Sequence, residues 1–389
     1  VASECGQYAS IAFNFTYEIN YTRNTPANIA ANQYPTHYSY NFMNGGFGWH
    51  GVSYFHSFEI ARINGHPSVE DFGYMNSCGP SYWMSGYPKY YQGMFNKIDE
   101  VYQIPVGTPE GLLILKNWLH NHLTGDDVGG IACFYSSTPW NLKLLPQGTP
   151  EGGKHVISEF LSPATHSSTI TGYNDSIRYD YNEDGQYTNH IDINGDGLVD
   201  MKDWEIGGLL FTDSYIGGVN WADSGFCYMM YKTLAEMTGQ GGIWNNAVHV
   251  VRIKEDYSPL LTMKVNIEHN CRDRLKIMAG VSGGPGSSFP EQIMGFPIFD
   301  FQGGCQNMQG GWEPEALALE LGLDITPLLG SIDPAEGATF FLLDYENDPN
   351  GWGNGKVIDY SLIDHMNNDQ EYPCPETNSP LVQNGLTLL

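Results

Sequence analysis

Alternating hydrophobic and polar residues dominate the last third of the chain. Every second residue is apolar from 261 to 267 and again from 275 to 281. A period of two is typical of strands that bury one face and expose the other. A polar turn at 269–271 separates the two runs, so the pattern predicts a hairpin.

Two further runs in this region have the same character. Residues 339–345 and 356–363 are rich in aromatic and β-branched residues and are bounded by Gly, Asn, Asp and Pro. The pattern changes near Tyr257. We therefore predict a first domain at 1–257 and an antiparallel β-sandwich domain at 258–389.

A helical pattern precedes this boundary. Thr108 can cap a helix, Pro109 suits its first turn and Gly125 can end it. The apolar residues between them recur at helical spacing: Leu112, Leu115, Leu119 and Leu123. A helix is expected here.

The N-terminal segment gives a conflicting signal. From Ala9 to Tyr21 the odd positions are apolar or aromatic, and all but one of the residues between them are polar. By period alone this segment is a strand.

An acidic loop at 192–203 has the spacing of a calcium site. Calcium takes six to eight oxygen ligands, and a twelve-residue loop with Gly at its sixth position can supply them. The predicted ligands are Asp192, Asn194, Asp196, Asp200 and Asp203, together with the carbonyl of Leu198. Asp at the twelfth position resembles the loops of dockerins and of secreted bacterial modules, which favours a structural site.

A second loop of this kind starts just upstream. Asp180, Asn182 and Asp184 have the same spacing, but the twelfth position is Ile191. A further ligand must therefore come from Asp192 or elsewhere. The alternative for both loops is a solvated acidic turn, because Asn, Asp and Gly favour turns.

A third oxygen-rich segment lies in the predicted sandwich. It contains Asp344, Glu346, Asp348 and Asn350. A further calcium site and a solvated turn are both compatible with this spacing.

Composition narrows the range of partners and locations. The formal net charge is −27 with only 17 Lys and Arg, so phosphate backbones and acidic membrane surfaces are excluded as partners. No apolar run has the length of a bilayer span. Charged residues make up only 16% of the chain, and calcium loops of moderate affinity fill outside cells. A secreted or cell-surface protein is expected.

The seven cysteines are compatible with disulfides in such a location. Their odd number leaves one free or paired with another molecule. Spacing does not give the connectivity.

Two predicted strands carry candidate catalytic residues. His166 opens an apolar, β-branched run that ends in Gly172 and Tyr173. A second run, 209–215, contains Asp213 and leads into Trp221 to Tyr228.

These segments resemble the His and Asn motifs of papain-like cysteine peptidases. The resemblance places His166 at the catalytic histidine, Asp213 at the orienting asparagine and Tyr215 at the tryptophan that shields them. The N-terminal Cys5-Gly6-Gln7-Tyr8 resembles the family's Cys-Gly-Ser-Cys nucleophile motif, and Glu18 matches a Glu farther along the same helix. This implies a helix at the N-terminus, in place of the strand that the alternation predicts.

The resemblance implies that Tyr8 occupies the nucleophile position. A phenol has an ordinary pKa of about 10 and cannot replace a thiolate there. Ala2 stands where the family has its oxyanion-hole glutamine, which usually contributes ~3 kcal/mol. Together with Asp213 in place of Asn, these departures favour an inactive relative.

An alternative alignment makes Cys5 the nucleophile with His166 and Asp213 as its partners. The competing role for Cys5 is one half of a disulfide. Geometry decides such arrangements, and spacing does not.

The combined expectation is an α+β protein. A papain-like two-lobed domain, with a helical lobe and a β-barrel-like lobe, carries a calcium-binding insertion at about 174–205 and precedes the β-sandwich. This organisation resembles secreted Bacteroidota proteins. The expected function is binding of a peptide or protein, or a structural role, without peptidase activity. The alternatives are an active endopeptidase using Cys5 and His166, and a self-associating subunit of an extracellular assembly.

Overall fold

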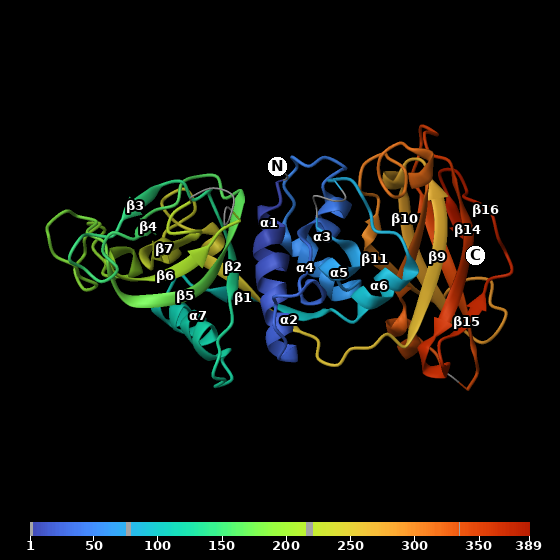
Figure 1. The fold of residues 1–389 in the computed structure, drawn as a ribbon, viewed down its shortest axis with the longest axis horizontal. Helices are drawn as coiled ribbons and strands as arrows, with labels where there is room; N and C mark the ends of the chain where they lie inside the picture. The colour runs from blue at the N-terminus through green and yellow to red at the C-terminus, as the bar shows by residue number, and fades with distance from the viewer. Residues whose placement is uncertain (1–2, 75–78, 215–220, 334) are drawn as a thin grey trace. The chain divides into compact units, whose positions relative to one another are not determined.

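The computed structural model describes residues 3–74, 79–214, 221–333 and 335–389 (Figure 1). The chain forms two compact units, each assembled from separate segments. The sandwich unit contains residues 1–7, 22–99 and 253–389, and the sheet unit contains residues 8–21 and 100–252. The predicted α+β class is confirmed, since helices accompany several antiparallel sheets. These units differ from the predicted domains 1–257 and 258–389. Residues 22–99 belong to the same unit as the C-terminal strands.

The N-terminal segment is helical over its whole length. It comprises α1 (Cys5–Gln7), the π-helical η1 (Tyr8–Phe15) and α2 (Thr16–Arg23). The strand that alternation favoured is wrong, and the helix is confirmed. Both sets of residues are buried in this helix, the apolar Ile11 and Phe15 as well as the polar Asn14 and Glu18. A helix covered on nearly all sides has no amphipathic stripe to reveal it.

The sheet unit is built around one eight-stranded sheet. Its strands follow the order β1-β8-β2-β5-β6-β7-β4-β3. Their bounds are β1 (Ile98–Pro105), β2 (Ala132–Ser136), β3 (Leu142–Leu144), β4 (His155–Ile157), β5 (His166–Arg178), β6 (Ile206–Thr212), β7 (Phe226–Met230) and β8 (Ala247–Ile253). The helices α7 (Pro109–Asn121) and α8 (Lys232–Ala235) also belong to it. An apolar core, which includes Phe134, Ile170 and Phe211, joins the central strands to α7.

Helix α7 confirms the predicted capping at its start. The Thr108 side chain accepts a hydrogen bond from the Gly111 amide, and Pro109 occupies the first turn. The helix ends at Asn121, before the predicted Gly125. His122 takes the left-handed conformation there, with a φ of 54°, and so ends the helix in the way a glycine usually does.

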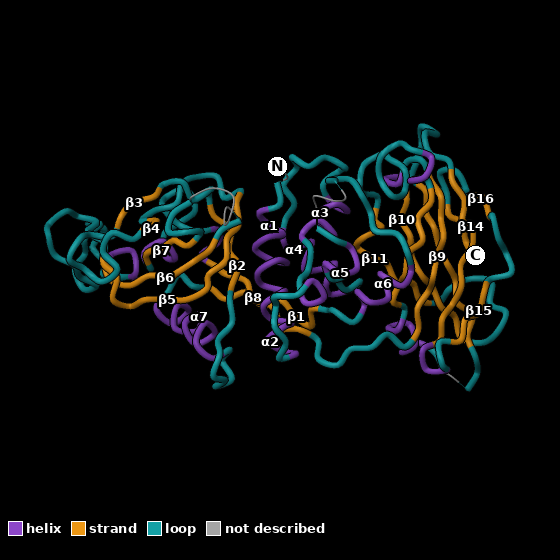
Figure 2. Tube along the Cα trace, in the orientation of Figure 1, coloured by secondary structure: helices purple, strands orange, loops and turns teal. Residues whose placement is uncertain are grey.

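The sandwich unit contains two facing antiparallel sheets and a group of helices (Figure 2). One sheet has the order β11-β10-β13-β17, and the other has β12-β9-β14-β15 with β16 paired to β14. The strands are β9 (Leu261–His269), β10 (Leu275–Gly283), β11 (Gln292–Asp300), β12 (Ala318–Asp324), β13 (Ala338–Glu346), β14 (Gly355–Asp364), β15 (Gln370–Pro373), β16 (Ser379–Pro380) and β17 (Leu386–Leu388). The helices are α3 (Thr36–Met43), α4 (Tyr54–Ile63), α5 (Val69–Phe72) and α6 (Tyr87–Met94). One core joins the inner faces of both sheets to these helices.

The predicted strands of this unit are present as β9, β10, β13 and β14, but the predicted hairpin is wrong. β9 pairs with β12 and β14, whereas β10 pairs with β11 and β13. The turn at 269–271 therefore carries the chain from one sheet to the other. A disulfide between Cys271 and Cys305 lies at this crossing.

Candidate functional site

The structure brings His166 and Asp213 together in the sheet unit. His166 is the first residue of β5, and Asp213 directly follows β6, its antiparallel neighbour. The His166 Nε2 lies 2.7 Å from the Asp213 Oδ2, and both side chains are buried. The hydroxyl of Ser168 donates to the same carboxylate oxygen at 2.6 Å.

This geometry decides which nitrogen of His166 carries the proton. A carboxylate only accepts hydrogen bonds, so Nε2 carries the proton and donates it to Asp213. Nδ1 is then the basic nitrogen of the neutral ring. An acid that holds an imidazole in this way is the orienting part of a general-base arrangement.

Tyr8 begins η1, and this helix packs against the strand that carries His166. The hydroxyl of Thr169 on β5 donates to the carbonyl of Ala9 at 3.2 Å, so Tyr8 directly precedes a residue bonded to β5. The Tyr8 side chain remains 39% exposed. The residue on this helix that follows the Cys-Gly-Gln motif is therefore a partly exposed phenol.

Cys5 lies on α1 and belongs to the sandwich unit. Its thiol is free in the structure, so the disulfide predicted as one role for Cys5 is not formed. Gly6 explains part of the local sequence: a Cβ at this position would lie 2.6 Å from the carbonyl oxygen of Val52. The helix approaches the backbone too closely there for any side chain.

The segment after Asp213 is anchored in the sheet unit. Trp221 is buried in the core, and its ring N–H donates to the Pro139 carbonyl at 3.0 Å. The Thr212 hydroxyl donates to the carbonyl of Gly225 at 3.0 Å. Tyr215 and Ala2 lie outside the described residues.

The loop at 192–203 is organised by its own carboxylates. Asp192 accepts hydrogen bonds from the amides of Gly195 and Gly197 at 2.7 and 2.9 Å. Gly197, the sixth residue of the loop, has a φ of 87°, which favours glycine. The buried Asp203 accepts from the second and ninth residues, Ile193 and Asp200, at 3.1 and 3.0 Å. The twelfth residue therefore closes the loop onto its start.

Other oxygens of this loop have local roles. Asn194 and Asp196 accept amide hydrogen bonds within the loop, and Asp200 caps the short helix η4 (Met201–Asp203). The Leu198 side chain is exposed.

The upstream loop repeats this arrangement. Asp180 accepts from the amides of Asp184 and of Gly185, its sixth residue, at 3.2 and 2.9 Å. Asn182 also accepts from the Asp184 amide at 3.2 Å. The φ of Gly185 is 78°.

Sequence reasoning missed the residue that closes the upstream loop. Glu205 is buried, and its carboxylate accepts from the amides of Tyr181 and Thr188 at 2.9 and 3.0 Å. These are the second and ninth residues of that loop, the two positions that Asp203 binds in the other loop. Glu205 follows the downstream loop in the chain, so a search of twelve consecutive residues could not have found it.

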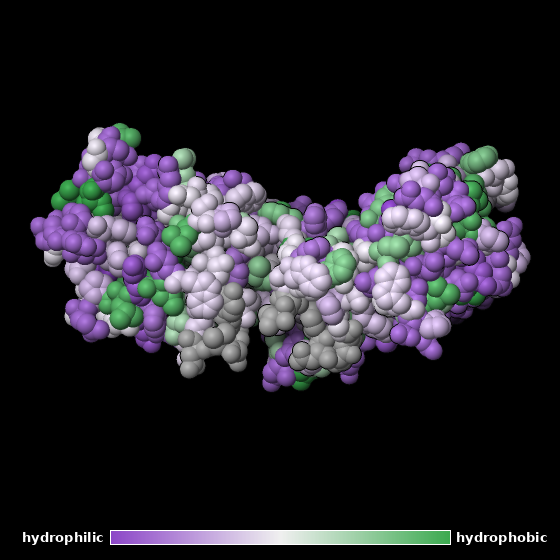
Figure 3. All heavy atoms as spheres, turned by 90° about the horizontal axis from the view of Figure 1, so that it is seen from above, coloured by the Kyte–Doolittle hydropathy of each residue, from purple (hydrophilic) through white to green (hydrophobic). Residues whose placement is uncertain are grey.

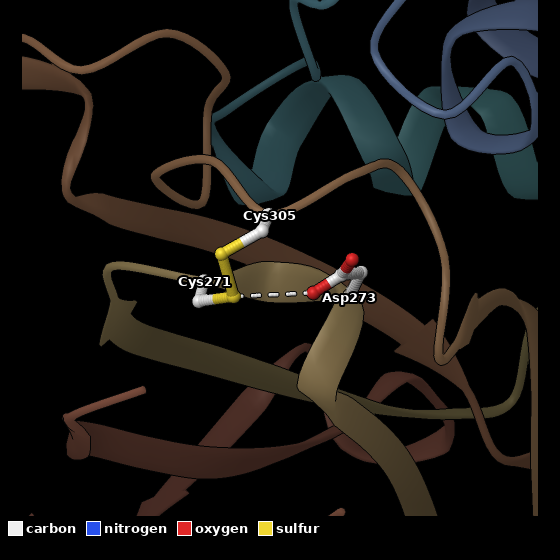
Figure 4. Close-up of side chains that lie close together, drawn as sticks. All are labelled: Cys271, Asp273 and Cys305. Atoms are coloured by element: carbon white, nitrogen blue, oxygen red, sulfur yellow. Dashed lines mark hydrogen bonds between the residues drawn. A yellow bond between two sulfur atoms is a disulfide. The ribbon is translucent and has the colours of Figure 1, made fainter. Parts of the chain in front are cut away.

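Within the described parts of the chain, one group of three potential ligand atoms converges within 4.8 Å: Cys271, Asp273 and Cys305 (Figure 4). Its two sulfurs form a disulfide. Metal binding by cysteine requires a thiolate, so this group is not a metal centre. The carboxylates of the two acidic loops do not converge in this way.

Exposed aromatic residues bear on the predicted self-association. Trp49 and Trp312 are each 69% exposed. On the face drawn in Figure 3, strongly hydrophobic residues lie in small separate groups among polar ones. Trp49 stacks on the exposed Phe47, with ring centroids 4.9 Å apart. Small apolar groups of this kind are normal on protein surfaces, so they give this alternative no specific support.

Among the described residues, no helix combines the length and apolar character that crossing a membrane requires. In comparisons with known protein families and with curated proteins, no family and no protein matches the chain. The function is therefore argued from the residues of the site.

Proposed function

We propose that this chain is a secreted, calcium-stabilised protein with a papain-like site that lacks peptidase activity and binds a peptide or protein segment. One observation carries the proposal. Asp213 holds His166 at 2.7 Å, and the strand that carries His166, β5, packs against the helical segment η1, whose first residue is Tyr8. The base and its orienting acid are present, and a phenol stands in the nucleophile position.

The chemistry of that phenol argues against catalysis. A cysteine nucleophile attacks as a thiolate, which a neighbouring imidazolium and a helix N-terminus stabilise. The hydroxyl of Tyr8 lies several bonds farther from the backbone than a thiol would, and its ordinary pKa is about 10. Binding does not require the nucleophile, and the exposed ring of Tyr8 offers an apolar face with a polar end.

We further propose that both acidic loops bind Ca²⁺. Asp192, Asn194, Asp196, Leu198, Asp200 and Asp203 would hold one ion, and Asp180, Asn182, Asp184 and Glu205 would contribute to the other. The matching hydrogen bonds of Asp203 and Glu205 support two related sites. Ca²⁺ would neutralise the clustered carboxylates and stabilise the loops between β5 and β6.

An epoxysuccinyl probe of cysteine peptidases tests the absence of activity. The protein is incubated with the probe and Ca²⁺, and adducts are mapped by peptide mass spectrometry. We expect no adduct in the wild-type protein. We expect an adduct at residue 8 in Tyr8→Cys, because this change puts a thiol at the position that the resemblance assigns to the nucleophile. Tyr8→Cys combined with His166→Ala is the matched control, and its labelling should fall.

Two outcomes would overturn the proposal. Labelling of wild-type Cys5 that disappears in His166→Ala would make the chain an active peptidase. Equal labelling of Tyr8→Cys with and without His166 would mean that the pair does not serve position 8.

A further inference from the structure

Three buried carboxylates alternate with exposed residues along the end of strand β13 and the two residues after it. Asp344, Glu346 and Asp348 are only 2%, 3% and 1% exposed, whereas the intervening Tyr345 and Asn347 are exposed. Side chains two residues apart in extended backbone lie on the same face. Asp344 and Glu346 therefore lie on one side of β13, and the buried Asp348 follows two residues after the end of the strand. The solvated turn that the sequence also allowed is excluded for them.

That side faces the interior of the sandwich. Asp344 is paired in register with Ile277, and Glu346 with Leu275, on the neighbouring strand β10. Both partners belong to the apolar core between the two sheets. Residues directly opposite each other in antiparallel strands share a face, so Asp344 and Glu346 project toward the core.

Glu346 has a donor on the opposite sheet. The Nδ1 of the buried His269 accepts a hydrogen bond from the Cys271 amide at 3.0 Å. Nε2 therefore carries the proton when the ring is neutral, and it lies 3.2 Å from the Glu346 Oε1. Burial lowers the pKa of His269, although Glu346 opposes that effect. A neutral donor of this kind does not balance the charge of the carboxylate.

The loop after β13 closes over the same place. The amide of Gly353 donates to the Asp348 Oδ2 at 2.5 Å. A Cβ on Gly353 would lie 2.7 Å from the Glu346 Oε1 and 2.6 Å from the His269 ring. The close approach of this glycine joins Asp348, Glu346 and His269 in one enclosed cluster.

Asp344 is the most unusual member of the cluster. Among the residues that the structure describes, neither of its carboxylate oxygens has a hydrogen-bond partner, and the Asp348 Oδ1 has none either. Within the described segments, no Lys, Arg or His forms an ion pair with Asp344 or Asp348. Burial, together with the charge of Glu346, raises the pKa of Asp344 well above its ordinary value. An unpaired buried charge is so costly that such groups are normally paired, bound to a metal or protonated.

We propose that Asp344, Glu346 and Asp348 form a site for one hard divalent cation of the calcium class. All three side chains offer oxygen ligands, which such cations prefer. The cation would supply the positive charge that the cluster lacks and would satisfy the unpartnered oxygens. At least one pair of the three ligand atoms is more than 4.8 Å apart, so binding requires side-chain rotation that draws them together.

This site is separate from the two loops of the sheet unit and from the proposed peptide-binding site. A neutral, protonated Asp344 is the competing explanation for its burial. It predicts no response of this cluster to calcium.

Calcium titration of the full chain distinguishes the two explanations. The protein is stripped with EDTA, desalted and titrated with Ca²⁺ by calorimetry. Asp344→Asn preserves the shape of the side chain and removes its charge. We expect this variant to bind one Ca²⁺ fewer per chain than wild type. Asp333→Asn, an equal charge change on an exposed loop of the same unit, should bind the wild-type number.

Thermal unfolding gives a second measure that does not depend on stoichiometry. In EDTA, Asp344→Asn should unfold at a higher temperature than wild type, because a buried carboxylate is removed. In excess Ca²⁺ the order should reverse, since only wild type gains the sandwich ion. Asp348→Asn should lose the same ion.

The proposal is overturned if Asp344→Asn binds as many Ca²⁺ ions as wild type, or if its unfolding temperature differs from wild type equally in EDTA and Ca²⁺. A failure of the loop sites gives a different result. In that case Asp192→Asn and Asp180→Asn would leave the number of bound ions unchanged, while Asp344→Asn would still lower it.

Discussion

Replacing Asp203 by Asn tests how the downstream acidic loop is stabilised. The Asp203 carboxylate is fully buried and accepts three amide hydrogen bonds, from Ile193, Asn194 and Asp200, at 3.1, 3.2 and 3.0 Å. An Asn side chain keeps one oxygen, which can still accept from two of these amides. Its NH₂ group would face the Asp200 amide, so two donors would meet.

The magnitude follows from these contacts. A hydrogen bond to a charged group contributes about 1.5–3 kcal/mol to stability. In Asp203→Asn one of the three bonds is lost, and the other two are made to a neutral amide oxygen in place of a carboxylate. We expect Asp203→Asn to lower the free energy of unfolding by about 2–4 kcal/mol without Ca²⁺. For a unit of this size, each kcal/mol shifts Tm by about 2–4 °C, so a fall of at least about 4 °C is expected.

Calcium adds a second, separate loss. A ligand present at 100 times its Kd stabilises the native state by about 2.7 kcal/mol, and Asp203→Asn should lose most of this gain. Asp196→Asn is the matched control. Its side chain is exposed and accepts only the Leu198 amide, which an Asn oxygen can also do, so it should weaken calcium binding without changing Tm in EDTA.

Differential scanning calorimetry in EDTA and in excess Ca²⁺ measures both quantities. An unchanged Tm of Asp203→Asn in EDTA would refute the hydrogen-bond argument. A wild-type Tm that does not respond to Ca²⁺ would refute the structural role of the ion.

Three further predictions concern the sheet unit and the cysteines. Glu205→Gln should remove one bound Ca²⁺ and leave the ion at Asp203 in place; loss of neither ion in native mass spectra would contradict its assignment to the upstream loop. Burial alone would lower the pKa of His122, but its hydrogen bond to Glu18 at 3.0 Å and the charge of Glu18 outweigh this and raise it. A raised pKa stabilises the fold fully below the unfolded value, about 6.5 for His, and the effect is lost as pH rises through the folded value. The free energy of unfolding of wild type, measured in urea, should therefore exceed that of His122→Gln by less at pH 8 than at pH 6. A difference that grows with pH would mean that the fold lowers the pKa of His122. Burial raises the pKa of the Cys133 thiol to about 12 and also raises that of Cys227, so iodoacetamide should modify both more slowly than Cys5 and Cys374; equal rates in the native protein would contradict this burial.

The candidate site could be predicted from the sequence only in part. His166 and Asp213 were identified as partners, and their hydrogen bond confirms that they meet. The role of Tyr8 as the nucleophile position stays a prediction. Glu205 had no signal in the spacing, because it reaches the upstream loop from beyond the downstream one.

Local interactions explain what the sequence by itself determined. The cap of α7 at Thr108 and the turns around Gly185 and Gly197 depend on neighbours a few residues away. The strands of the sandwich were visible because each has one apolar face, which gives a period of two.

Tertiary structure decided the rest. The alternating N-terminal segment is a helix, since burial on nearly all sides removes the contrast that a period depends on. β9 and β10 have the same alternating pattern but belong to different sheets. The residues of each strand do not indicate which sheet it joins. Asp344 ends a predicted strand and begins an acidic segment that also allowed a solvated turn, and its register with Ile277 directs it into the core. Its environment follows from the pairing of distant strands, and only the folded chain determines that pairing.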